Sequence, residues 1–136
     1  MDDVVLNKAA IVERCIQRIR EEHAGDDAVL ENNLTKQDSI ILNIQRACEA
    51  AIDLGMHLVR RLRLGIPQDS RDAFDLLTQA TDLDKDLAVR LCRVVGFRNV
   101  VVHDYPRVNL AIVRAIVANH LEEIAALAEW AVRRYG

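Results

Sequence analysis

The sequence has few of the residues that end helices and few of those that build sheets. Only two prolines and five glycines occur among 136 residues, and aromatic residues make up 4%. Sandwiches and barrels need many tight turns and favour aromatic and β-branched residues, whereas a helical bundle needs few turns. Polar and apolar residues alternate nowhere over a useful length, and the valines at 100–102 form the one strand-like spot. This composition indicates an all-α protein.

Long apolar runs are also absent. Every apolar stretch is short and interrupted by charge, and the acidic start "MDDVVLNKAA" lacks the apolar region of a secretory signal. The three cysteines, Cys15, Cys48 and Cys92, are odd in number and lack the spacing of metal ligands. They are typical of small buried residues in a reduced protein. We therefore expect a cytoplasmic protein that does not span or bind a membrane.

Lysine is scarce, since fifteen of the eighteen basic residues are arginine. The net charge of −3 argues weakly against nucleic acid as a partner, but the charges are unevenly distributed. Residues 1–38 contain nine acids and five bases, whereas residues 87–114 contain five arginines and one aspartate. Guanidinium groups bind phosphate through two parallel hydrogen bonds. The second segment is therefore a candidate for anion binding, although a solvated charged surface explains any single arginine equally well.

Apolar residues recur every three or four positions along most of the chain, which predicts helices. The expected helices cover residues 4–19, 36–62, 70–80, 83–104 and 109–134. Short polar connections between them favour neighbours that run in opposite directions. We therefore predict an up-and-down bundle of four main helices and one short extra helix, with residues 1–136 as a single domain.

Polar residues at the predicted starts supply the helix caps. Thr35 and Asp38 resemble a capping box at the start of the long second helix. Asp69 or Ser70 caps the short helix. That short helix is expected to bury three apolar residues, which are Phe74, Leu77 and Ala80.

The fourth predicted helix carries an arginine among its buried positions. Its core stripe comprises Leu83, Leu87, Leu91, Val94 or Val95, Arg98, Val102 and Tyr105. An unpaired charge in such a stripe is costly, so Arg98 needs a carboxylate partner. Asp38, Glu49 and Asp53 on the long helix are the candidates.

A second row of side chains lies about 100° around the same helix. It begins with the small residues Ala88, Cys92 and Gly96 and continues with Asn99 and His103. Small side chains let another helix approach closely, either from within the chain or from a second subunit. We expect the chain to form a homodimer.

The stretch "FRNVVVHDYP" sets four polar side chains around the three valines: Arg98, Asn99, His103 and Tyr105. Arg98 and His103 lie about 140° apart on a regular helix. The length of the arginine side chain, or local unwinding in the valine run, would let them converge. Pro106 disfavours helical geometry at the preceding residue, so the helix is expected to close near His103 or Asp104.

Each of these residues has an ordinary explanation when it is taken alone. A histidine at a helix end interacts favourably with the helix dipole. A tyrosine before a proline is usually a packing residue, and an arginine in a core stripe usually has a carboxylate partner. The combination is what indicates a functional site.

The motif "RNVVVHDY" resembles the R-x4-6-H motif of HEPN domains, in which a polar residue follows the arginine. The tyrosine two residues after the histidine narrows the pattern to R-x4-H-x-Y. That form is similar to the HepT toxins (the DUF86 group) of HepT/MntA toxin–antitoxin pairs. The length, the helical character and the long second helix agree with this resemblance, which covers essentially the whole chain.

The resemblance implies a HEPN-like bundle that pairs as a dimer and acts as a metal-independent ribonuclease without a cofactor. Arg98 and His103 would be the catalytic residues, with Asn99 in support. A histidine exchanges protons readily near neutral pH, and an arginine can hold two phosphate oxygens at once. Asn99 could orient the imidazole or bind the phosphate. The same resemblance implies an MntA-like nucleotidyltransferase antitoxin that transfers AMP onto Tyr105.

Two other classes of function stay open at this point. One is a non-catalytic HEPN-type helical dimer that binds a nucleotide or docks a nucleotidyltransferase. The other is a structural bundle without a site, which leaves Arg98 unexplained. An intact pair of Arg98 and His103 favours the enzyme, because a scaffold needs neither residue.

Overall fold

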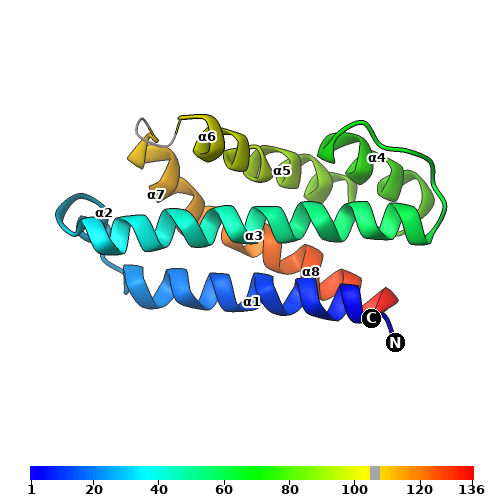
Figure 1. Ribbon diagram of the computed structural model, residues 1–136, viewed down its shortest axis with the longest axis horizontal. Helices are drawn as coiled ribbons and strands as arrows, with labels where there is room; N and C mark the ends of the chain where they lie inside the picture. The colour runs from blue at the N-terminus through cyan, green and yellow to red at the C-terminus, as the bar shows by residue number, and fades with distance from the viewer. Residues whose placement is uncertain (105–107) are drawn as a thin grey trace.

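The computed structural model describes residues 1–104 and 108–136, and the side chains of residues 102–104 lie outside this description. Figure 1 shows the helices in order: α1 (Asp3–His23), α2 (Ala28–Asn32), α3 (Leu34–Arg61), α4 (Ser70–Ala80), α5 (Lys85–Val95), α6 (Phe97–Asp104), α7 (Leu110–Asn119) and α8 (Leu121–Tyr135). The described residues include no strand, and the valines at 100 and 101 are helical. The prediction of an all-α fold is confirmed.

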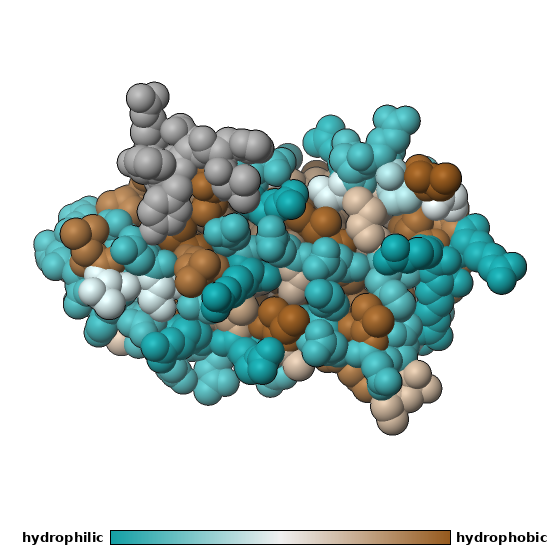
Figure 2. Space-filling view, in the orientation of Figure 1, coloured by the Kyte–Doolittle hydropathy of each residue, from teal (hydrophilic) through white to brown (hydrophobic). Residues whose placement is uncertain are grey.

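The long helix α3 is the centre of the bundle. It runs antiparallel to α1, and α5 and α6 lie along its other side (Figure 1). Helix α8 packs against both α1 and α3, and the short α4 packs on the C-terminal half of α3. The fully buried side chains from these helices include Ile19, Ile44, Leu54, Leu91 and Leu127. In the same orientation, the face crossed by α3 is mostly hydrophilic, with separate hydrophobic side chains (Figure 2).

Local hydrogen bonds explain where the helices begin. The Asp69 side chain accepts a hydrogen bond from the backbone N–H of Asp72, so Asp69 is the cap of α4. At α3 the cap is Asn33, whose side chain accepts from the N–H of Lys36. The predicted capping box of Thr35 and Asp38 is therefore wrong. The sequence did not predict the short helix α2, which ends directly before Asn33. The extended backbone of Asn33 places its side-chain amide oxygen over the first turn of α3, so Asn33 is the cap.

The predicted fourth and last helices are each divided in two. His120 interrupts the last helix, because its backbone (φ −121°, ψ −6°) leaves the helical region between α7 and α8. Gly96 divides the fourth helix into α5 and α6, and the N–H of Asn99 bonds to the Gly96 carbonyl at 3.1 Å in a tighter turn. No described helix combines the length and the apolar character that a membrane span requires.

The division at Gly96 changes which side chains of α6 are buried. Phe97 and Val101 point into the core, one position earlier than the predicted stripe. Arg98 is consequently not a core residue, since 43% of its side chain is exposed. The prediction that Arg98 is buried in phase with the leucines is wrong, because it assumed one continuous helix. Ala80, predicted to be buried, is exposed at the last position of α4.

Within the described chain a close helix approach occurs at Gly55, whereas Gly96 of the predicted row of small residues has no neighbouring helix against it. Ala88 is buried, but a Cβ atom added at Gly96 would meet only carbonyl oxygens of its own helix within 4 Å among the described atoms. A Cβ atom added at Gly55 on α3 would lie 2.9 Å from Cε1 of Phe74 on α4. Phe74 is completely buried. Gly55 therefore lets α4 pack directly against the backbone of α3.

The three cysteines are free thiols, as predicted. Cys15 and Cys48 are buried, and Cys92 is half-buried. The thiol of Cys48 donates a hydrogen bond to the carbonyl oxygen of Val94 at 3.4 Å and so links α3 to α5. Burial raises the pKa of Cys48 to about 12, and the charge of Glu49 adds to this increase.

Candidate functional site

Helix α6 carries most of the motif and is anchored by two apolar side chains. Phe97 and Val101 are buried against the core, and α6 packs against α3. The side chains between these anchors face away from the core. Arg98 is partly exposed, and Asn99 is exposed. Arg98 and Asn99 are therefore presented at the surface by a helix whose opposite face is anchored in the core.

Glu49 on α3 holds Arg98. The Nε atom of Arg98 donates a hydrogen bond to Oε1 of Glu49 at 3.1 Å. Glu49 is one of the three candidate partners, and Asp53 is instead paired with Lys8 at 3.0 Å. The predicted pairing of Arg98 with one of these carboxylates is confirmed, although the burial from which it was argued is not.

The geometry of this ion pair determines what Arg98 can still bind. Only Nε is bonded to Glu49, and the two terminal nitrogens have no hydrogen bond to any other described residue. The terminal nitrogens form the end-on fork of a guanidinium, which binds two oxygens of a phosphate or carboxylate. Glu49 thus orients the side chain from its flank and leaves the fork for an anion.

The other motif residues are placed less completely. The side chain of Asn99 makes no hydrogen bond to another described residue. The backbone of His103 belongs to α6, but its side chain lies outside the described residues. Tyr105 and Pro106 lie outside them altogether. The convergence of Arg98 with His103 and the position of Tyr105 stay predictions.

The valine run is helical and is not unwound. Val100 and Val101 belong to α6, which continues to Asp104. The irregular point is Gly96, directly before the motif. Because of this break, the buried positions of α6 are Phe97 and Val101, and the Arg98 side chain points away from the core.

The basic and acidic segments of the sequence partly neutralise each other. Arg114 on α7 bonds to Glu31 at 2.6 Å, and its Nε lies 3.8 Å from a carboxylate oxygen of Asp27. Arg90 on α5 lies 4.0 Å from the buried Glu123. The excess of arginine in residues 87–114 is therefore mainly structural at these two positions. Arg98 has a shorter Nε contact, at 3.1 Å to Glu49, and its terminal nitrogens have no described partner.

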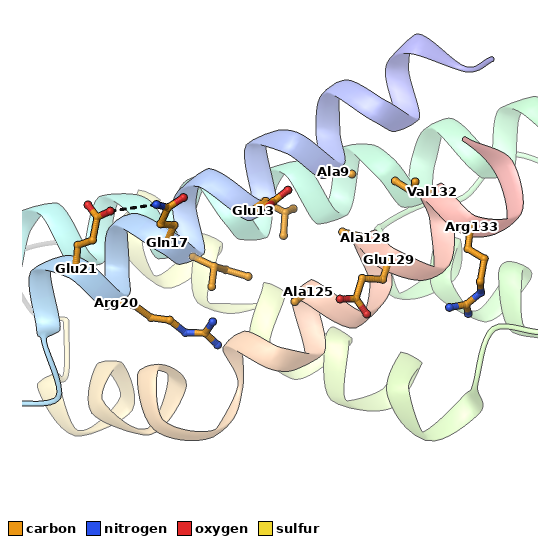
Figure 3. A pocket seen from close by; sticks show the side chains of 12 residues that line it. Ala9, Glu13, Gln17, Arg20, Glu21, Ala125, Ala128, Glu129, Val132 and Arg133 are labelled. Atoms are coloured by element: carbon orange, nitrogen blue, oxygen red, sulfur yellow. Dashed lines mark hydrogen bonds between the residues drawn. The ribbon is translucent and has the colours of Figure 1, made fainter.

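A separate groove of about 890 Å³ lies between α1 and α8 (Figure 3). Its floor is apolar, with Ala9, Ala125 and Ala128 among the residues that line it. Its rim carries charges of both signs, including Arg20 and Glu129. Of the motif residues whose side chains are described, none lines this groove. Among the described residues, no group of three or more histidine, cysteine, aspartate and glutamate side chains is close enough to hold a metal ion.

The sequence profile of the family described as "Ribonuclease HepT-like" matches residues 12–130. The chain belongs to this family. The resemblance drawn from R-x4-H-x-Y is thereby confirmed. The match covers all of the helices from the third turn of α1 onward except the end of α8, so the fold as well as the motif is that of a HepT-like protein.

Individual HepT-like relatives agree with this assignment. The chain is 47% identical over 123 residues to the mRNA nuclease HepT of Shewanella oneidensis, which covers 90% of this chain and 92% of that protein. The solved structure of the tri-AMPylated Shewanella oneidensis HEPN toxin in complex with the MNT antitoxin matches with a TM-score of 0.89 and 43% identity, covering 98% and 100% of the two chains. A toxin–antitoxin structure with AMP-PNP matches with a TM-score of 0.88 and 42% identity, covering 98% and 99%. The predicted HEPN-like bundle is confirmed.

Proposed function

We propose that this protein is the toxin of a toxin–antitoxin pair and that it cleaves RNA as a metal-independent endoribonuclease. The observation that carries this proposal is the placement of Arg98. Glu49 holds its Nε atom, and its terminal fork lies on the exposed face of α6 without another described partner. Membership of the ribonuclease HepT-like family and the similarity to an mRNA nuclease support the same activity.

The chemistry needs a base, an acid and a cation. A base removes the proton of the ribose 2′-hydroxyl, whose oxygen attacks the adjacent phosphorus. An acid then protonates the leaving 5′-oxygen, and the products carry a 2′,3′-cyclic phosphate and a 5′-hydroxyl. His103 provides the proton transfer, because an imidazole gains and loses a proton near neutral pH. Arg98 binds two phosphate oxygens and is already charged before the transition state forms.

Two further features complete this proposal. Asn99, the neighbour of Arg98 on the exposed face of α6, orients the imidazole or donates a hydrogen bond to the phosphate. The protein acts as a homodimer of single-domain subunits in the cytoplasm, so that two copies of His103 share the roles of base and acid. Sedimentation at micromolar concentration should give a dimer. A species of the monomer mass, 15.3 kDa, well above that concentration would contradict the pairing.

The activity is tested by cleavage of RNA with purified protein. His103→Ala should abolish cleavage, whereas the wild type should remain active in excess EDTA and release products with 2′,3′-cyclic phosphate ends. Loss of activity in EDTA that Mg²⁺ restores would refute the metal-independent mechanism. A wild type that binds RNA but leaves it intact under all these conditions would favour a non-catalytic binding module.

The partner in this proposal is an MntA-like nucleotidyltransferase that uses ATP to modify Tyr105. The phenol oxygen attacks the α-phosphorus of ATP, its proton passes to a base of the antitoxin or to solvent, and pyrophosphate leaves. The bound AMP brings an anion close to the motif, where it competes with RNA phosphate for Arg98. Similarity to a tri-AMPylated toxin in complex with its antitoxin supports this role.

The modification is tested by intact mass after incubation with antitoxin and ATP. The wild type should gain one or more AMP units and lose its ribonuclease activity, whereas Tyr105→Phe should gain none and should escape neutralisation. Tyr135→Phe is the matched control, because the Tyr135 ring is held against Trp130 and Arg61. If Tyr105→Phe is modified and silenced like the wild type, the role of Tyr105 is wrong and Tyr135 becomes the next tyrosine to test.

A further inference from the structure

A groove of about 700 Å³ between α1 and α3 gathers three arginines. Arg14 and Arg18 are one turn apart on α1, and Arg46 faces them from α3. Asp38 is the one acidic residue among those that line the groove. We call this feature the arginine groove. Its lining carries a net charge of +2, three arginines less one aspartate, although residues 1–38 have an excess of four acids.

We propose that the arginine groove binds the phosphodiester backbone of the RNA substrate where the strand continues beyond the cleavage site. This proposal rests on the proposed ribonuclease activity, because it identifies how the same substrate is held at a distance from Arg98. It assigns the groove to phosphate groups and riboses, not to a particular base sequence.

Two of the three guanidinium groups are available to an anion. Arg14 and Arg46 have no ion-pair or hydrogen-bond partner among the described residues. Arg18 is paired with Glu21 and Glu22 on its own helix, at 3.5 and 3.0 Å. The pair with the exposed Glu21 contributes little and a phosphate can displace it at small cost, whereas Glu22 is only 15% exposed and holds Arg18 more firmly. The charges of Arg46 and Arg14 also act to lower the pKa of Cys15 on the groove wall, against the larger effect of burial.

Neutral groups on the groove wall complement these charges. Asn43 is only 9% exposed, and its Nδ2 donates hydrogen bonds to the carbonyl oxygen of Ser39 at 2.8 Å and to its hydroxyl oxygen at 3.4 Å. The Ser39 hydroxyl accepts in the second bond, so its proton is free to donate to a phosphate oxygen. Leu42 exposes apolar surface beside them, against which a ribose or a base can pack. Proteins that hold single strands combine positive grooves with such surfaces.

The arginine groove and the motif lie on either side of α3. Arg46 and Glu49 are one helical turn apart on α3, and Glu49 holds Arg98. Helix α1 lies along one side of α3 and α6 along the other (Figure 1). A strand bound at Arg98 therefore needs to cross only the width of one helix, about 10 Å, to reach the groove. About three stacked nucleotides cover that distance.

The test compares two pairs of substitutions in full-length protein. Arg14→Gln with Arg46→Gln removes two charges from the arginine groove. Arg20→Gln with Arg133→Gln removes two charges from the groove between α1 and α8, and so controls for the change in net charge. Binding of a labelled single-stranded RNA is measured on the His103→Ala background, so that the probe stays intact. Cleavage of a long RNA and of a dinucleotide is measured with His103 present.

We expect the Arg14/Arg46 pair to weaken RNA binding on the order of ten-fold at moderate salt. The slope of log K against log salt should fall by about 1.4, which is ~0.7 for each lost phosphate contact. The value of kcat/KM for long RNA should fall by the same factor, whereas cleavage of the dinucleotide should be unchanged, because a dinucleotide does not reach the groove. The control pair should behave like the wild type.

Other outcomes separate this proposal from the one on which it rests. Wild-type protein that cleaves neither substrate would refute the ribonuclease activity itself. Active protein whose Arg14/Arg46 pair keeps the wild-type affinity and salt slope would refute the arginine groove alone, as would an equal loss in the control pair. If the Arg14/Arg46 pair binds RNA normally but is no longer neutralised by the antitoxin, the groove contacts an acidic protein surface and the proposal is wrong.

Discussion

Replacing Arg98 with alanine should separate the contribution of this residue to catalysis from its contribution to stability. The ion pair with Glu49 is 3.1 Å long, and the two side chains are 43% and 45% exposed. Pairs this exposed contribute about 0.2–1 kcal/mol, so Arg98→Ala should lower the free energy of unfolding by less than about 1 kcal/mol. A domain that is stable by several kcal/mol stays almost fully folded after such a loss.

The same substitution should have a much larger effect on cleavage. It removes the guanidinium fork, which has no other described partner and can bind two phosphate oxygens whose negative charge grows in the transition state. Loss of one such contact costs about 10²–10³ in rate, or about 2.7–4 kcal/mol. Arg98→Lys should remain strongly impaired, because an ammonium group keeps the charge but cannot form the two parallel bonds.

Glu49→Gln is the matched control, since it removes the charge of the partner and leaves the guanidinium in place. It should reduce stability as little as Arg98→Ala does, because both break the same exposed pair. The cleavage rate should fall by about ten-fold or less, because the guanidinium of Arg98 is then less well oriented, which raises the activation free energy by up to about 1.4 kcal/mol.

The assay pairs initial rates of RNA cleavage with urea unfolding of each variant. Arg98→Ala with cleavage within a few-fold of the wild type would show that the fork does not contact the reacting phosphate. A Glu49→Gln variant as inactive as Arg98→Ala would show that the carboxylate takes part in the reaction itself, contrary to the positioning role inferred from the Nε contact.

Three further substitutions or measurements test the packing and electrostatics of the bundle. Gly55→Ala should lower the free energy of unfolding by about 0–2 kcal/mol. A clash with the buried Phe74 ring costs about 1–3 kcal/mol, and the better helix propensity of alanine offsets about 1 kcal/mol of it. In a Phe74→Leu background, the same Gly55→Ala change should no longer lower the free energy of unfolding. The pKa of Asp2 is lowered from 3.8 to about 2, and the largest cause is its hydrogen bond with His57. Ionised Asp2 therefore stabilises the fold above pH 3.8, and this contribution is lost as the pH falls toward 2. Asp2→Asn should therefore melt below the wild type at pH 6, and the difference should vanish near pH 2. Cys48 should resist alkylation in the native protein at pH 8 and react once it is unfolded, because burial raises its pKa to about 12; rapid native labelling at this position would contradict its placement.

Features that depend on neighbours in the sequence could be predicted without the structure. The all-α class follows from periodic apolar residues, and the cap of α4 follows from Asp69 because its bond to Asp72 spans only three residues. The last helix likewise begins after Asn109, as predicted. The family could be recognised because R-x4-H-x-Y is a contiguous pattern. The same contiguous pattern identifies His103 and Tyr105 as site residues, and their roles stay predictions.

Features that depend on residues far apart in the chain were decided only by packing. After the break at Gly96, the buried positions of the helix lie one residue earlier than in a continuous helix. A shift of one residue corresponds to a rotation of about 100° around the helix axis, so Phe97 lies in the core and Arg98 on the surface. Three carboxylates were equally suitable partners for Arg98 by spacing, but the approach of α6 to α3 placed Glu49 beside it. Arg14 and Arg46 belong to different helices, and only the antiparallel packing of α1 on α3 brings their charges into one groove.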